Sequence, residues 1–210
     1  MPIEKSQVVQ KALEILSRDG LEGVSIRRLA TELKIKGASI YWHIPAKSEL
    51  IDEMANAILD KHFKAFDFQN DERDWEEWLN TLAHELRAAM LDYRDGARVV
   101  AGTHPDLGQV LIKLWDLTIR VLHKAGFSYA MAATITVTVT NFTFGSVIEE
   151  QSSQLPEAGP KLQLAELPQA LRSALEEWQH ENDDLRFNTA VRIIINGVRA
   201  ELNAQSSRLN

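Results

Sequence analysis

The chain has 210 residues, 45% of them hydrophobic, and a formal net charge of −7. That apolar content is sufficient for one medium-sized domain, or for a small domain joined to a larger one. Cysteine is absent, which excludes disulfides, thiolate metal sites and a cysteine nucleophile. The N-terminal stretch lacks the apolar core of a signal peptide, and no run approaches the roughly 18 uninterrupted apolar residues of a membrane span. These features predict a cytoplasmic protein with no membrane partner.

The net charge is unevenly distributed along the chain. Residues 1–48 carry eight Lys and Arg against five Asp and Glu, a net charge of +3, whereas the remaining residues carry 15 against 25, a net charge of −10. A basic end on an acidic body is expected when only that end meets phosphate groups. Ordinary variation in surface charge is the alternative explanation.

Apolar residues recur at helical spacing through the first third of the chain. The predicted helices of this part cover residues 5–18, 26–33, 38–43 and 47–66. Ser25 is suited to cap the second helix. Pro45 separates the third helix from the fourth, because proline lacks an amide hydrogen and suits a first helical turn. The fourth helix follows without a linker, so we expect it to join the first three rigidly to the rest of the chain.

The rest of the chain also has mostly helical patterning. The predicted segments cover residues 74–92, 94–101, 106–123, 128–151, 168–178 and 183–202. The β-branched run 134–140 has strand propensity, and a strand is the alternative there, but its length and the capped helices around it favour a helix. Residues 151–167 contain two prolines and a glycine without clear periodicity, which predicts a loop. Residues 203–210 are expected to fray. The predicted fold class is all-α.

Residues 25–47 have the composition of a DNA-reading helix-turn-helix. Short residues at the start of the third helix let its backbone enter the major groove, and aromatic and hydroxyl side chains after them can contact bases and phosphates. An arginine at position 27 can form a bidentate contact with guanine or bind phosphate. The alternative is that the aromatic residues belong to a core and the cations to a solvated face. The candidate DNA-binding residues are Arg27, Arg28, Gly37, Ala38, Ser39, Tyr41, Trp42, His43 and Lys47.

The segment GLEGVSIRRLATELKIKGASIYWHIPAKSELID resembles the DNA-binding domain of the tetracycline repressor (TetR) family. Further segments match that family in the same order: Tyr93–Ala97, Gly102-Thr103, Phe142–Gly145 and Glu149-Glu150. The resemblance implies an all-α homodimer that binds a palindromic double-stranded DNA operator and is released by a small-molecule effector.

The resemblance also implies a division of the chain. A helix-turn-helix DNA-binding domain would cover residues 1–46, a ligand-binding and dimerisation domain residues 47–204, and a frayed tail residues 205–210. The helices predicted at 128–151 and 183–202 would form a four-helix bundle with their mates. We call residues 1–46 the head and residues 47–204 the body. A ligand in the body would shift the helix that begins at residue 47, so that the two heads of the dimer no longer match successive major grooves.

Two positions of the head depart from the family pattern. Lys34 stands where the family usually has glycine in the turn, and a lysine in the left-handed conformation stores about 1 kcal/mol of strain. Gly37 and Ala38 stand where tetracycline-responsive members have glutamine and proline. Since this removes a base-reading amide, we expect a different operator.

Larger departures lie in the body. Tetracycline-responsive members have drug- and magnesium-binding histidines where this chain has Phe63 and Val100, and an isopropyl group cannot coordinate a hard cation. His104 replaces a loop arginine, and two leucines replace an asparagine and a phenylalanine. These changes predict a small, largely apolar effector and no metal or cofactor. The candidate ligand-binding residues are Phe63, Leu82, Leu86, Val100, Thr103, His104, Pro105, Asp116, Leu117, Thr136 and Glu149.

Three alternatives remain open. A tetracycline-magnesium effector would need His62 or His104 to replace the missing metal ligand. A DNA-binding activator or architectural protein would have no effector. An enzyme is the least favoured alternative, because the six histidines lack the HExxH spacing and adjacent glutamates on a helix point about 100° apart. We therefore predict no catalytic residues.

Overall fold

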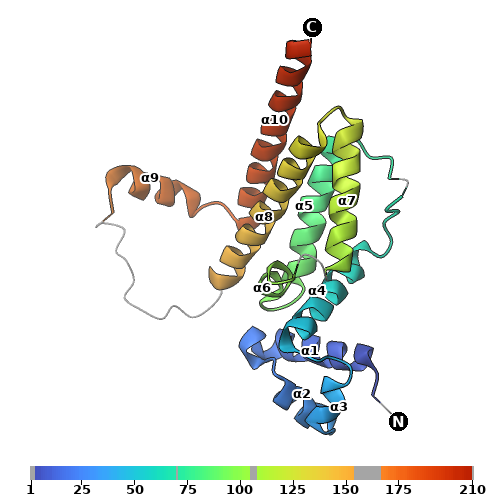
Figure 1. Ribbon diagram of the computed structural model, residues 1–210. Coiled ribbons are helices and arrows are strands. Elements are labelled where there is room, and N and C mark those ends of the chain that lie inside the picture. Colours follow the sequence, from blue (N-terminus) through green and yellow to red (C-terminus); the bar gives the residue numbers. More distant parts are fainter. Residues whose placement is uncertain (1–2, 70, 105–107, 154–166, 210) are drawn as a thin grey trace. The chain divides into compact units, whose positions relative to one another are not determined.

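The computed structural model describes residues 3–69, 71–104, 108–153 and 167–209, with side chains as far as residue 205. Within these ranges the chain contains ten α-helices, a short 3₁₀ helix and no β-strand (Figure 1), which confirms the all-α class. The chain divides into two compact units, residues 1–151 and 152–210. The predicted functional boundary between residues 46 and 47 falls inside the first unit and stays a prediction.

The observed helices follow the predicted ones in order and number. They are α1 (Lys5–Asp19), η1 (Leu21–Gly23), α2 (Ile26–Leu33), α3 (Gly37–Tyr41), α4 (Lys47–Phe63), α5 (Trp75–Leu91), α6 (Gly96–Ala101), α7 (Gln109–Lys124), α8 (Tyr129–Ser153), α9 (Gln169–Trp178) and α10 (Asp183–Leu209). Most ends agree with the prediction to within one turn of helix. The exception is α10, which continues through residues 203–209, where fraying was predicted, because residues 200–205 are helix-tolerant and include no glycine or proline to stop it.

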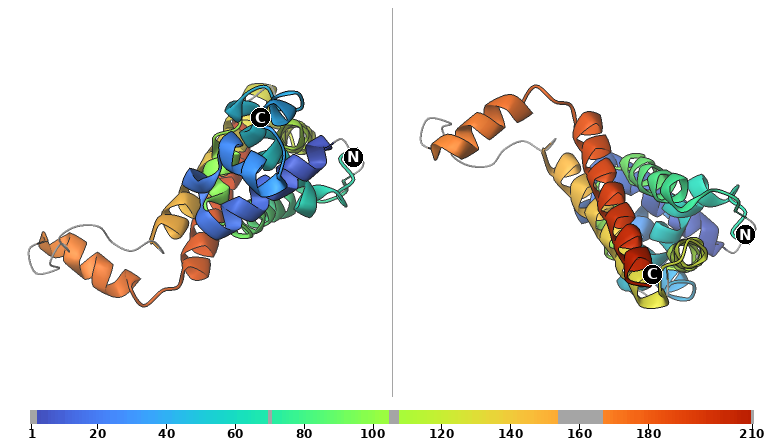
Figure 2. Two further views of the ribbon diagram at one scale, coloured as in Figure 1. Left: turned by 90° about the horizontal axis from the view of Figure 1, so that it is seen from below. Right: turned by 90° about the horizontal axis from the view of Figure 1, so that it is seen from above.

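Helices α1, α2 and α3 form the head at one end of the first unit (Figure 1), and they face the viewer when the unit is seen from that end (Figure 2, left). Val8, Leu29 and Ile40 are fully buried and form its core. The Ser25 hydroxyl accepts a hydrogen bond from the Arg28 amide at 3.3 Å, which confirms the predicted N-cap of α2. The head is therefore a small three-helix core of its own.

The turn between α2 and α3 has the conformation that the family pattern requires. Lys34 is left-handed, with φ 56° and ψ 40°. Its amide donates to the Thr31 carbonyl at 3.2 Å, and the Ile35 amide donates to the Ala30 carbonyl at 3.0 Å, so the last carbonyls of α2 are satisfied. The position that glycine would occupy without steric strain is thus occupied by lysine.

Helix α4 is the centre of the first unit, since it contacts α1, α5, α6 and α7. Leu50, Met54 and Ile58 are fully buried along it. A second link between the head and the body runs through α6, where the Asp95 carboxylate accepts a hydrogen bond from the Leu21 amide at 2.8 Å. The head therefore contacts the body both through α4 and through the Asp95–Leu21 hydrogen bond.

Helix α8 shows that the β-branched run 134–140 is helical, as the prediction favoured. Its buried threonine hydroxyls donate to carbonyl oxygens four residues earlier, Thr136 to Ala132 at 2.8 Å and Thr140 to Thr136 at 2.7 Å. Each hydroxyl is therefore satisfied inside its own helix. By length and mean hydropathy, α8 could also cross a membrane, but the core helix of a water-soluble domain meets the same test.

Candidate functional site

The head exposes large aromatic side chains. Trp42 is 85% exposed and Tyr41 is 52% exposed, side by side where α3 ends. Two adjacent, exposed large aromatic side chains form the kind of apolar surface that marks an interaction site. The alternative that these aromatic residues belong to the core is therefore wrong, because the core position of α3 is taken by Ile40.

Arginine and tyrosine from two different helices meet on this face. Arg27 at the start of α2 and Tyr41 in α3 line one surface hollow of about 400 Å³, whose apolar wall is formed by Ile26, Ala30 and Ile35. A guanidinium and a phenol at the rim of an apolar hollow can donate to base edges or phosphates while the wall receives an apolar group of a base. The structure thus brings together residues that lie 14 positions apart in the sequence.

The other predicted head residues divide into exposed and engaged ones. Ala38, Ser39 and Lys47 are exposed, and Gly37 and His43 are partly exposed. Arg28 instead forms ion pairs with Asp19 of α1 at 2.5 Å and with Glu32 one turn along α2 at 3.3 Å.

Arg18 joins these groups from α1, at 2.5 Å from Glu32. Hydrogen bonds from the Arg18 guanidinium hold the pKa of both Asp19 and Glu32 below their ordinary values. The Arg28 charge is therefore already compensated by acids that join α1 to α2.

In the body, Thr136 and the apolar candidate residues are buried in the core of the first unit. Five helices supply them. The side chains of these residues are almost completely buried: Phe63 of α4, Leu82 and Leu86 of α5, Val100 of α6, Leu117 of α7 and Thr136 of α8. The Thr136 hydroxyl is used within its helix, so the region they form is apolar.

Apart from Thr136, the polar candidates that the structure describes are not brought into the core. Asp116 is exposed and pairs with Arg120 at 2.9 Å, because the buried stripe of α7 passes through Leu114 and Leu117 and leaves position 116 on the outer face. Glu149 is exposed on α8, and Thr103 is partly exposed. Pro105 lies outside the described residues.

One buried carboxylate escaped the sequence analysis. Asp52 of α4 is only 2% exposed. Its Oδ1 accepts a hydrogen bond from the His104 backbone amide at 2.9 Å, and its Oδ2 lies 3.2 Å from the His104 Nδ1. Asp52 thus joins the central helix to the segment after α6. The signal that could have found it is an aspartate inside the apolar stripe of α4, next to Ile51.

The two histidines considered as metal ligands are engaged elsewhere. His62 lies between two carboxylates, with Nε2 at 2.9 Å from Asp92 and Nδ1 at 3.3 Å from Glu85. His104 Nδ1 lies 3.2 Å from the Asp52 carboxylate. Within the part of the chain that the structure describes, no group of three or more His, Asp or Glu side chains is placed to hold a metal ion.

Comparisons with known proteins agree with this architecture. Residues 8–54 match the family model for bacterial regulatory proteins of the tetR family, and residues 69–202 match that of the tetracyclin repressor-like C-terminal domain. The chain is 34% identical over 199 residues to the tetracycline repressor protein class A from transposon 1721 of Escherichia coli, covering 93% of this chain and 90% of the relative. It is 32% identical over 209 residues to the class D protein of the same species, covering 96% and 92%.

Solved structures give the same result. A possible TetR family transcriptional regulator from Streptomyces coelicolor A3(2) superimposes with a TM-score of 0.81 at 32% identity, over 94% of this chain and 99% of that chain. A TetR variant from Acinetobacter baumannii AYE in complex with minocycline gives a TM-score of 0.77 at 31% identity, over 94% of both chains. Since the family models cover both the head and the body, the chain belongs to the TetR family of bacterial regulatory proteins and is a DNA-binding transcriptional regulator, not an enzyme.

Proposed function

We propose that the protein is a ligand-responsive repressor that binds a palindromic operator as a homodimer and is released by a small, largely apolar effector. The observation that carries the DNA-binding part is the exposure of Trp42 and Tyr41 beside Arg27 on the head. DNA binding supports a cytoplasmic location.

The head would read DNA with α3 in the major groove. Arg27 and Tyr41 are proposed to contact base edges or phosphates from the rim of their shared hollow, and Trp42 to pack against the sugar-phosphate backbone. Gly37, Ala38, Ser39 and His43 would lie at the groove, and Lys47 would neutralise a phosphate near the start of α4. Arg28 is assigned to the junction of α1 and α2 instead, because Asp19 and Glu32 already compensate its charge.

The apolar core that Phe63, Leu86 and Val100 help to form supports an effector with few polar groups. The named relatives that are tetracycline repressors, and the minocycline complex of a similar protein, make a tetracycline the second candidate. Two differences weigh against tetracycline with magnesium. Apolar side chains occupy the positions of the family's drug- and metal-binding histidines, and both nearby histidines are held by carboxylates.

The dimer is proposed to form through α8 and α10. Each helix exposes apolar side chains that a single chain leaves in water: Val137 on α8 is 43% exposed and Ile193 on α10 is 64% exposed. Burial of such side chains against a second copy is favourable by about 25 cal/mol per Å² of apolar surface. A two-fold dimer would present two heads to successive major grooves.

Selection of bound fragments from random DNA, followed by fluorescence anisotropy on the selected site, tests this function. We expect the wild-type protein to select a palindrome, and Arg27→Ala and Tyr41→Ala each to weaken binding at least ten-fold. Lys124→Ala, which removes an exposed positive charge at the far end of α7, should bind as the wild type does. Failure to enrich any sequence, or unchanged affinity in both head variants, would contradict the proposal.

The effector is tested on the same complex. A panel of apolar small molecules and of tetracyclines with magnesium is added to the protein bound to its selected operator. We expect an apolar compound to release the DNA and the tetracyclines to have no effect. Release by a tetracycline only in the presence of magnesium would establish the second candidate. Affinity that no compound changes would favour an effector-independent regulator.

A further inference from the structure

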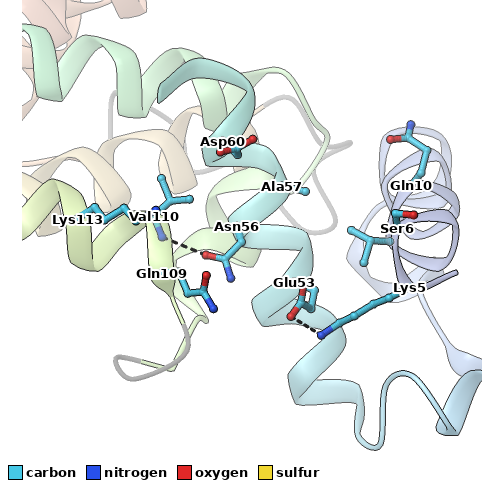
Figure 3. A pocket seen from close by; sticks show the side chains of 11 residues that line it. Lys5, Ser6, Gln10, Glu53, Asn56, Ala57, Asp60, Gln109, Val110 and Lys113 are labelled. Atoms are coloured by element: carbon cyan, nitrogen blue, oxygen red, sulfur yellow. Dashed lines mark hydrogen bonds and ion pairs between the residues drawn. The ribbon is translucent and has the colours of Figure 1, made fainter. Parts of the chain in front are cut away.

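A polar cleft of about 510 Å³ lies between the head and the body. In Figure 3, α4 runs between α1 on one side and α7 on the other, and side chains from all three helices line the cleft. None of the residues proposed above for effector binding is among them. The cleft is therefore separate from the apolar core of the body.

Several lining residues already have partners. Lys5 of α1 pairs with Glu53 of α4 at 2.6 Å and lies 3.5 Å from Glu49 (Figure 3). The hydrogen bond to Glu53 holds the pKa of Lys5 above its ordinary value. The Asn56 side-chain oxygen accepts a hydrogen bond from the Val110 amide at 3.3 Å, which joins α4 to the start of α7.

The lining also carries two opposite charges that do not pair. Asp60 lies one turn beyond Asn56 on α4, and Lys113 lies about one turn beyond Val110 on α7. Both side chains are exposed. Neither forms an ion pair within 4.0 Å with any residue that the structure describes. An anionic and a cationic group thus face the same space without neutralising each other.

The remaining lining fits a molecule with an apolar body. Val9, Ala57 and Val110 supply apolar surface from the three helices, and Gln10 and Gln109 supply amide groups that both donate and accept. The charged lining residues are two lysines and two acids, so the cleft as a whole attracts neither anions nor cations. A ligand with one charge would pair with only one of Asp60 and Lys113, whereas a ligand with two opposite charges could pair with both.

We propose that this cleft binds a zwitterion with an apolar body, of the chemical class of apolar amino acids and short peptides. The ligand ammonium would pair with Asp60 and its carboxylate with Lys113, while the apolar body would lie on Val9, Ala57 and Val110. Such a ligand contacts α1 of the head and α4 and α7 of the body together, so its occupancy favours the head position seen in the structure. The inference goes beyond the proposed function, since it concerns a second site whose occupancy is measured without DNA.

Isothermal titration calorimetry of the full chain without DNA tests the site. The probes are L-leucine, L-phenylalanine and the dipeptide L-leucyl-L-phenylalanine. We expect at least one probe to bind saturably with a Kd below about 1 mM. The N-acetylated and C-amidated forms of that probe each lack one charge and should bind at least ten-fold more weakly. Absence of saturable binding by all three probes would overturn the proposal.

Substitutions then locate the binding. Asp60→Asn and Lys113→Gln should each weaken the probe at least ten-fold, whereas Lys124→Gln, outside the cleft on the same α7, should leave it unchanged. The exposed, unpaired positions predict unchanged melting temperatures for all three variants, which thermal unfolding checks. Binding that survives both cleft substitutions would place the probe elsewhere and overturn the proposal.

The same preparations are also titrated with the selected operator. Operator binding without probe binding rejects the cleft alone, and probe binding without operator binding rejects the proposed function alone.

Discussion

Single backbone positions in the head and at its junction with the body set the local geometry. Lys34 is left-handed at the end of α2, and Gly20, with φ 75°, ends α1 close to Asp95. A Cβ on Gly20 would lie 2.6 Å from the Asp95 carboxylate. Glycine at this position therefore leaves room for the hydrogen bond that the Leu21 amide donates to Asp95. The sequence showed the departure at Lys34, but the contact between Gly20 and Asp95 joins residues too far apart in the chain to be predicted.

Replacing Lys34 by glycine should stabilise the protein. A residue with a Cβ in the left-handed conformation costs roughly 1–2 kcal/mol. Glycine removes this strain, but it loses more conformational entropy on folding, which offsets about 0.5–1 kcal/mol of the gain. We expect the free energy of unfolding in urea to rise by about 0.5 kcal/mol for Lys34→Gly. Lys36→Gly is the matched control, because Lys36 has an ordinary φ of −78° and should lose stability. A loss of stability at position 34 would contradict the account of strain.

A side chain at Gly96 would clash with the backbone. A Cβ there would lie 2.1 Å from the Met90 carbonyl oxygen, a backbone atom that cannot move aside cheaply. We expect Gly96→Ala to lower the free energy of unfolding by about 1–3 kcal/mol, the usual cost of overpacking. Gly37→Ala should not show this loss in the same urea titration, since a Cβ at Gly37 meets nothing within 4 Å.

Individual helices were predicted from the sequence, but the contacts between them were not. The apolar stripe of α4 predicted its burial, whereas the role of Asp52 depends on His104, which the fold brings to α4 from 52 positions away. The same holds for Arg87 of α5 and Glu150 of α8, which form two hydrogen bonds at 2.9 and 3.0 Å. Sequence periodicity cannot identify such pairs, because each partner by itself looks like an ordinary surface charge.

The pair between Arg87 and Glu150 is largely shielded from water. Arg87→Met would leave the Glu150 carboxylate poorly compensated, at a cost of about 3 kcal/mol of unfolding free energy. Adding Glu150→Gln to that variant should recover much of the loss, as a double-mutant cycle in urea would show. Lys11→Met, which breaks the more exposed pair with Glu14, should cost less than about 1 kcal/mol. Equal costs in the two single variants would contradict this ranking.

For the whole molecule, the family resemblance gave the right fold class and the right kind of protein. The unequal charge of the two ends of the chain agrees with a head that meets DNA and a body that does not.

Acid should destabilise the protein in part through Asp92. A hydrogen bond from Lys61, with a further one from His62, holds the pKa of Asp92 below its ordinary value of 3.8. A carboxyl group with a lowered pKa stabilises the folded state above the unfolded-state pKa, and this contribution disappears as the pH falls through the folded-state pKa. We therefore expect Asp92→Asn to reduce the difference in unfolding free energy between about pH 6 and about pH 2. An unchanged difference would contradict this assignment.

The proposed dimer makes a prediction about mass. Val137→Glu on α8 and Ile193→Glu on α10 would each place a charge in the proposed bundle, where desolvation opposes association. Sedimentation velocity should show a dimer for the wild type and a monomer for both variants. Lys124→Glu, an exposed position on α7, should remain dimeric. A dimer in both bundle variants would refute the proposed interface.

The sequence by itself determined the helices, their order, the helix-turn-helix head and the family to which the chain belongs. These depend on local periodicity, capping and turn residues, which act over a few positions of the chain. Only the tertiary structure decided that Arg28 belongs to an ion-pair network, that Asp116 faces solvent, that Asp52 holds His104, and that Asp60 and Lys113 share a cleft without pairing. The reason is physical: which partner a charge has, and whether it is buried, depends on which helices pack together, and no local pattern encodes that.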